Sequence, residues 1–250
     1  MDNNNNFNWT QKDVYVQDQT GVVAKKFFAN VFLWMFVALT LSTLSAIFMT
    51  SSPEIYSALR NLETGKPTTL GWIATFAPLG LVLLMSAGLS RLSYTALIGV
   101  FILYSALTGV SLSFILLIYT SASVITCFAA AAGIFGIMAF LGYTTDVDLS
   151  KFGPILMVGV VGLIIASVAN MFIQSESFSL FMAFVGIAIF TALTAYDVQK
   201  LKRIGAGLEE SGAQIQDADT KKLAIMGALS LYLDFLNIFI YLLRIFGDRR

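Results

Sequence analysis

The amino-acid sequence predicts an all-α integral membrane protein built as a bundle of about seven transmembrane helices. Of its 250 residues, 57% are hydrophobic and only 12% are charged, which is about half the charged fraction of an average soluble domain. The mean hydropathy is +0.80. The apolar residues also form long uninterrupted runs, and a run of about 18 or more can cross a bilayer as a helix.

Seven such runs divide the chain into spans. No charged residue occurs between positions 92 and 145. That stretch is too long for one crossing, and we divide it at Tyr119. A polar tail (1–26) precedes the first span, and a hydrophilic loop (198–222) separates the last two. The predicted spans cover residues 27–49, 71–89, 94–118, 122–143, 152–173, 178–197 and 223–246. A single transmembrane domain (27–247) therefore accounts for nearly the whole chain.

The basic residues orient the bundle, because Lys and Arg accumulate in the short loops on the cytoplasmic side. With the N-terminus in the cytoplasm, ten of the 15 basic residues fall on that side. Those ten are Lys12, Lys25, Lys26, Arg91, Lys151, Lys200, Lys202, Arg203, Lys221 and Lys222, and the others are Arg60, Lys66, Arg244, Arg249 and Arg250. The pattern predicts that the N-terminal tail and the hydrophilic loop are both cytoplasmic.

Composition excludes several classes of function. The formal net charge is zero, so no basic surface for nucleic acid is expected. The absence of histidine excludes histidine-ligated zinc sites and serine–histidine hydrolases. We expect no cofactor, and any pH response near neutrality must come from carboxylates in unusual surroundings. The lipid bilayer is the one macroscopic partner that the sequence identifies, and protein partners stay unknown.

The last span carries an acidic residue, Asp234, near its middle. A charge there costs at least about 2.5 to 3.5 kcal/mol on insertion scales, so such residues usually face a cavity or a partner. Polar neighbours at helical spacing form one stripe on a helix whose other faces are Leu, Ile and Phe. The stripe should point into the bundle, and its members are Ser230, Asp234, Asn237, Tyr241 and Arg244. Hydrogen bonding between helices would explain Ser230, Asn237 and Tyr241 equally well.

A second aspartate, Asp197, ends the sixth span. Two carboxylates in contact in a low dielectric cannot both ionise cheaply, so they would share a proton. The pair faces a geometric condition, because Asp234 lies about 18 Å along its helix from Lys222, whereas Asp197 is within two turns of its basic flank. The two can meet only if the last helix begins outside the membrane or the sixth lies deeper in it.

The last two spans resemble a known family. The strings AYDVQKLK (195–202) and GALSLYLDFLNIFIYLLRIFG (227–247) are similar to segments of the Bax inhibitor family, also called the transmembrane Bax inhibitor motif family. The likeness is greatest to a bacterial member, and in span number and order it runs from about residue 27 to residue 247. It implies a seven-helix fold with the last helix surrounded by the others, and a location in the bacterial inner membrane.

The resemblance also implies a function, which is a pH-sensitive calcium leak controlled by two aspartates that share a proton. Asp197, after Tyr196, and Asp234, after Leu233, occupy these two positions. They would hold calcium, the transported ion, only transiently. Arg91 matches by span order a family arginine that contacts the first aspartate and keeps the bundle shut, although a positive-inside anchor explains Arg91 as well. The role of the loop at 203–221, which is longer than in short bacterial relatives, stays open.

Other functions would use the same residues. A proton-coupled cation antiporter would saturate and would exchange protons for calcium in a fixed ratio. A membrane regulator of cell survival or stress would act through protein partners and transport nothing. An intramembrane aspartyl protease needs Gly-x-Gly-Asp for its second aspartate, whereas residues 231–234 are Leu-Tyr-Leu-Asp. We therefore expect a channel or leak and not an enzyme.

Overall fold

The computed structural model describes residues 21–51, 53–61 and 67–250, so most of the predicted N-terminal tail lies outside the described residues. The helices in chain order are α2 (Val22–Ser51), α3 (Pro53–Leu59), α4 (Thr69–Gly88), α5 (Tyr94–Ile118), α6 (Ser121–Thr144), the short 3-10 helix η1 (Leu149–Phe152), α7 (Gly153–Ile173), α8 (Glu176–Glu210) and α9 (Ala218–Phe246). Within the described ranges, seven helices are long and apolar enough to cross a membrane, which confirms the predicted fold class.

Hydroxyl side chains begin several of these helices. The backbone just before α4, α5, α6 and α8 is extended, and the hydroxyl there accepts a hydrogen bond from an amide of the first turn. Such caps satisfy donors that a helix leaves unpaired at its start, which matters most where water is scarce. The capping residues are Thr68, Ser93, Thr120 and Ser175.

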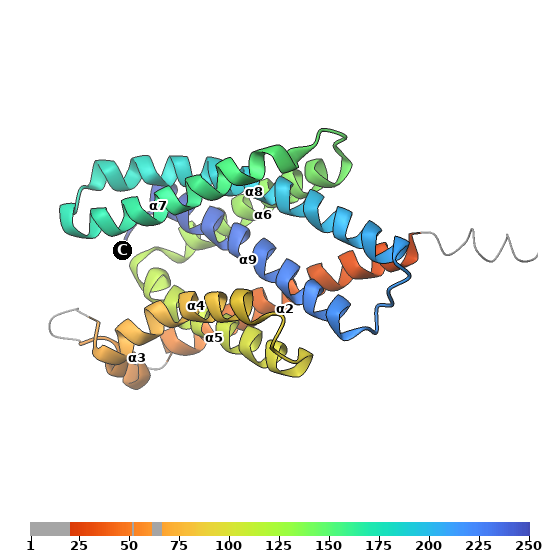
Figure 1. The fold of residues 1–250 in the computed structure, drawn as a ribbon. Coiled ribbons are helices and arrows are strands. Elements are labelled where there is room, and N and C mark those ends of the chain that lie inside the picture. Colours follow the sequence, from red (N-terminus) through yellow and green to blue (C-terminus); the bar gives the residue numbers. More distant parts are fainter. Residues whose placement is uncertain (1–20, 52, 62–66) are drawn as a thin grey trace, which may run out of the picture.

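The last helix runs through the centre of the bundle. Figure 1 shows α9 passing between a group formed by α2, α4 and α5 and a second group formed by α6, α7 and α8. It contacts α2, α5, α6 and α8. In its most apolar stretch 67% of residues are buried, against 6% for the span that contains α7. α9 is therefore the core of the protein, and α7 lies at the lipid-facing surface.

Close approach of the helices depends on glycine at a few positions. A Cβ atom at Gly109 of α5 would lie 2.3 Å from the carbonyl oxygen of Ser42 in α2, and one at Gly142 of α6 would lie 2.3 Å from that of Ala195 in α8. No side chain fits at such distances, so glycine lets these backbones touch. The Gly142 contact holds α6 against α8 two residues before Asp197.

The chain after α9 is pinned to the end of the bundle predicted to be extracytoplasmic. Arg250 N donates to the carbonyl oxygen of Ile118 (2.8 Å), and Thr120 N donates to that of Asp248 (3.0 Å). Asp248 N donates to the hydroxyl of Ser123 (3.0 Å). These bonds join the C-terminal residues to the α5–α6 connection and fix the far end of the central helix.

Some helices extend beyond the spans predicted for them, for one physical reason. The first helix begins at Val22, before the predicted start at residue 27, and α8 continues to Glu210 through most of the predicted loop 198–222. Hydropathy marks where a helix leaves the hydrocarbon core, but the hydrogen-bond ladder continues into water where the helix still has a surface to pack on. In α8 that surface includes Val198, Leu201 and Gly205, which are buried.

Candidate functional site

The length of α8 brings Asp197 to about the same depth in the bundle as Asp234. Asp197 lies 13 residues before the last residue of α8, and Asp234 lies 16 residues after the first residue of α9. At 1.5 Å per residue these positions are about 20 Å and about 24 Å from the connection between the two helices. The geometric condition on the pair is met because α8 runs past the predicted membrane boundary and α9 begins before it.

The two carboxylates form a buried pair between α8 and α9. Asp234 is 4% exposed, its charge interacts with that of Asp197, and its Oδ2 has no hydrogen-bond partner among the described residues. Asp197 is partly buried, and the side chain of Ser230 hydrogen-bonds to it. Two ionised carboxylates in such a place repel each other, and one proton between them removes the repulsion.

The rest of the polar stripe faces α8 only in part. The Tyr241 ring lies 6.1 Å from that of Phe190 in α8, between ring centroids. Asn237 turns to its own helix and donates to the carbonyl oxygen of Leu233 (2.8 Å). Arg244 is exposed at the end of α9, with its guanidinium 5.9 Å from the Tyr241 ring centroid. The stripe thus extends from the aspartate pair to the end of α9 that is predicted to be extracytoplasmic.

The structure does not bring Arg91 to either aspartate. Arg91 is exposed in the turn between α4 and α5, and no described acidic side chain forms an ion pair with it. The basic residue whose charge acts on Asp197 is Lys200, one turn further along α8. In this conformation the predicted arginine contact is absent.

The α6–α7 connection is fastened to α8 beside the pair. The amide of Gln199 accepts a bond from Leu149 N (2.8 Å) and donates one to the carbonyl oxygen of Val147 (2.7 Å). Arg203 forms an ion pair with Asp148. Hydrogen bonds from Ser150 and Arg203 hold the pKa of Asp148 well below its usual range. Asp148 is therefore ionised throughout the neutral range, and this contact is lost only in strong acid.

Replacing Gln199 with leucine is expected to free this connection. The change removes both hydrogen bonds and leaves two backbone groups unpaired, at a cost of about 1 to 3 kcal/mol. Hydrogen exchange at the Leu149 amide should accelerate by about tenfold or more. The exposed Gln216→Leu variant is the matched control, and equal exchange rates in the two variants would contradict the assignment.

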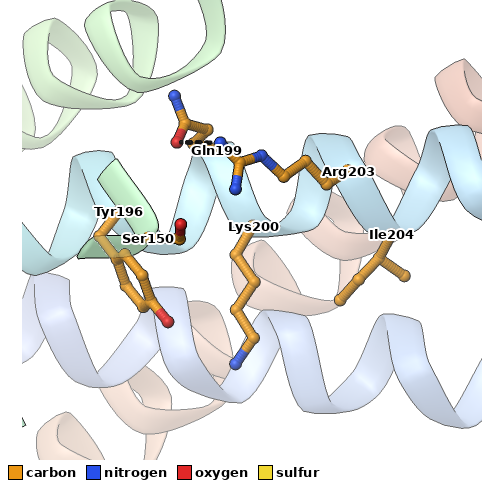
Figure 2. A pocket seen from close by; sticks show the side chains of 6 residues that line it. All are labelled: Ser150, Tyr196, Gln199, Lys200, Arg203 and Ile204. Carbon is orange, nitrogen blue, oxygen red and sulfur yellow. Dashed lines mark hydrogen bonds between the residues drawn. The ribbon is translucent and has the colours of Figure 1, made fainter. Parts of the chain in front are cut away.

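A cavity opens along the stretch of α8 that includes Asp197, at the predicted cytoplasmic end. It has a volume of about 290 Å³. Its lining residues come from α8 and η1, and they are Ser150, Tyr196, Gln199, Lys200, Arg203 and Ile204. Figure 2 shows Tyr196 and Lys200 extending toward α9, while Gln199 and Arg203 meet on the opposite side of α8. The start of α7 packs closely on the Tyr196 ring at Gly153. A Cβ atom at this glycine would lie only 2.8 Å from the ring.

Two carboxylates can attract a cation but cannot enclose one. Calcium in a tight site takes six to eight oxygen ligands, and within the described ranges no three acidic or cysteine side chains gather at one point. Asp197 and Asp234 could hold a calcium ion only together with water and backbone oxygens. Such a site suits passage of an ion better than its storage.

Sequence reasoning missed several residues around the pair. Gln199 and Lys200 follow Asp197 by two and three positions, and helical spacing alone could have drawn attention to Lys200. A separate buried cluster joins α2, α5 and α9. In it the hydroxyls of Ser42 and Tyr232 are hydrogen-bonded, and the rings of Tyr104 and Tyr232 meet edge to face. Nothing in the local sequence marks that cluster, because its members come from three distant helices.

Comparison with known proteins identifies the family. The family model described as inhibitor of apoptosis-promoting Bax1 matches residues 24–250. Inner membrane protein YbhL of Escherichia coli K12 is 40% identical over 243 residues, which is 96% of this chain and 98% of YbhL. Proteins of Rickettsia prowazekii (39%, covering 90% of this chain and 91% of theirs) and Deinococcus radiodurans (36%, covering 96% and 97%) carry no assigned function in their names. With its seven apolar helices, this chain belongs to the Bax inhibitor family as an integral protein of the bacterial inner membrane.

Proposed function

We propose that this protein is a pH-sensitive, calcium-permeable leak, gated by the proton that Asp197 and Asp234 share. The proposal rests on two interacting carboxylates, one on the central helix α9 and one on its main neighbour α8. Asp234 is buried, and one of its oxygens has no hydrogen-bond partner among the described residues. An intramembrane carboxylate without a partner is costly and usually marks an ion or proton pathway. No enzymatic activity is proposed.

The closed state is the protonated one. A proton between the carboxylates leaves one negative charge and draws α8 and α9 together at the level of Asp234. When that proton leaves, two like charges face each other in a low dielectric. They separate, admit water, or take up a cation, and each of these responses loosens the contact between the two helices.

The ionised pair then attracts a cation that enters the bundle. A divalent cation between two carboxylates restores the charge balance that the proton had provided. The polar stripe on α9 continues from this point through Asn237 and Tyr241 to Arg244 at the far end of the helix. Since the site supplies too few ligands to hold calcium tightly, the ion can leave again.

Calcium flux into liposomes that contain the purified protein tests the proposal. Flux should rise as the pH rises from about 5 to about 8, because the pair loses its shared proton in that direction. The Asp148 contact cannot produce this response, since its low pKa keeps Asp148 ionised over the whole range. The Asp148→Asn variant should therefore keep the pH dependence of the wild type.

Other outcomes of the same experiment would point elsewhere. Calcium flux that exports protons in a fixed ratio to calcium would replace the leak with an antiporter. Folded protein without flux above that of empty liposomes at any pH would refute transport and favour a regulator that acts through protein partners.

A further inference from the structure

Two basic side chains, Lys200 and Arg203, line the cavity on α8, and their surroundings differ. Arg203 is paired with Asp148 and also donates to Gln199. Lys200 is exposed, and it forms no ion pair with any acidic side chain in the described part of the chain. The cavity therefore contains one neutralised cation and one cation whose charge is not neutralised by a close contact.

The uncompensated charge lies about one helical turn from Asp197. Lys200 follows Asp197 by three residues, so both side chains leave the same face of α8. Figure 2 shows the Lys200 side chain extended from α8 toward α9, the helix that carries Asp234. Its charge acts on Asp197. Lys200 lies about one turn of α8 closer than Asp197 to the predicted cytoplasmic end.

Three other basic groups at this end have local partners. Lys202 donates to the carbonyl oxygen of Tyr143 (2.7 Å) and lies over its ring. Lys222 pairs with Asp219 at 2.9 Å, and Lys221 lies over the Tyr94 ring. Each of these three cations has a local partner, and Lys200 is the basic residue whose charge acts on Asp197.

We propose that the ammonium of Lys200 is a tethered counter-ion of the aspartate pair, which competes with calcium at the cytoplasmic mouth and so limits the leak. The proposal rests on the proposed function for its effect on flux. A lysine suits this role because its ammonium is a compact charge on a flexible four-carbon stem. It can lie over the ionised carboxylates and swing aside, whereas an ion-paired residue such as Arg203 cannot.

Calcium titration of flux tests the competition at one fixed pH. Lys200→Gln should lower the calcium concentration for half-maximal flux by about two- to fivefold, the range of a partly exposed charge. Lys200→Arg should stay near the wild type, and Lys202→Gln is the matched control with the same charge change two residues away. In about 1 M salt, where charges are screened within about 3 Å, the Lys200→Gln effect should largely vanish. Equal half-maximal concentrations for Lys200→Gln, Lys202→Gln and wild type at low salt would overturn the proposal.

A second measurement needs no flux. A water-soluble carbodiimide condenses an amine with a carboxylate that touches it, and mass spectrometry locates the amide. We expect an amide from Lys200 to Asp197 or Asp234, with the Lys222–Asp219 pair as internal positive control. If the wild type carries no calcium, the proposed leak fails, and the cross-link alone then decides the counter-ion. Formation of the control amide without any Lys200 amide would overturn it.

Discussion

Replacing Asp234 with asparagine is expected to reduce calcium flux by about tenfold or more at every pH at which the wild type conducts. Asparagine has nearly the same shape, so the packing of α9 against α8 should persist while the charge is lost. Unit charges about 4 Å apart attract by about 4 kcal/mol at an effective dielectric constant near 20, and each 1.4 kcal/mol is worth a factor of ten. Flux into liposomes measures the effect.

The control for this variant lies on the same helix. Asp219 is highly exposed in the first turn of α9, where it pairs with Lys222. Asp219→Asn makes the identical chemical change outside the bundle and should leave flux and its pH dependence as they are. Wild-type flux in Asp234→Asn, from protein shown to be folded, would remove the pair from the mechanism.

Replacing Gly142 with alanine should destabilise the bundle at the place where α6 meets α8. The added Cβ would lie 2.3 Å from the carbonyl oxygen and 2.8 Å from the Cα of Ala195. Both are backbone atoms, so the two helices must separate, and overpacking of this kind costs about 1 to 3 kcal/mol. The midpoint of thermal unfolding in detergent should fall, and the pH dependence of flux should change because Ala195 precedes Asp197 by two residues.

Gly136 provides the comparison for this variant. It lies on the same helix, and a Cβ there meets nothing within 4 Å. Gly136→Ala removes only the conformational freedom of glycine, which favours the helix by about 0.5 to 1 kcal/mol. A midpoint for Gly142→Ala at or above that of Gly136→Ala would show that the α6–α8 contact is looser than described.

Hydropathy was enough to predict the number and order of the spans, because only long apolar helices satisfy their backbone groups inside a bilayer. It could not predict where helices end in water. There α8 continues because Val198, Leu201 and Gly205 still pack on the bundle, and this extension is what brings Asp197 level with Asp234. The polar stripe predicted which face of the last helix turns into the bundle, since a single polar face on an apolar helix is expected to turn inward.

The surroundings of the pair could not be predicted in the same way. Gln199 reaches across to Val147 and Leu149, some fifty residues earlier in the chain, and no local pattern encodes that contact. The predicted Arg91 contact rested on span order alone. Span order fixes the end of the bundle on which a residue lies, but not the helix that it faces. In this conformation Lys200 is the basic residue whose charge acts on Asp197.

In the proposed leak, one shared proton on the aspartate pair closes the path for calcium. Infrared spectroscopy of the protonated carboxyl band, recorded on the same liposomes as calcium flux, follows this proton and the flux together. We expect one such band that Asp197→Asn and Asp234→Asn each shift or remove, and that disappears over the same pH interval in which flux appears. A band that persists unchanged while flux rises, or flux that rises without any protonated pair at low pH, would contradict it.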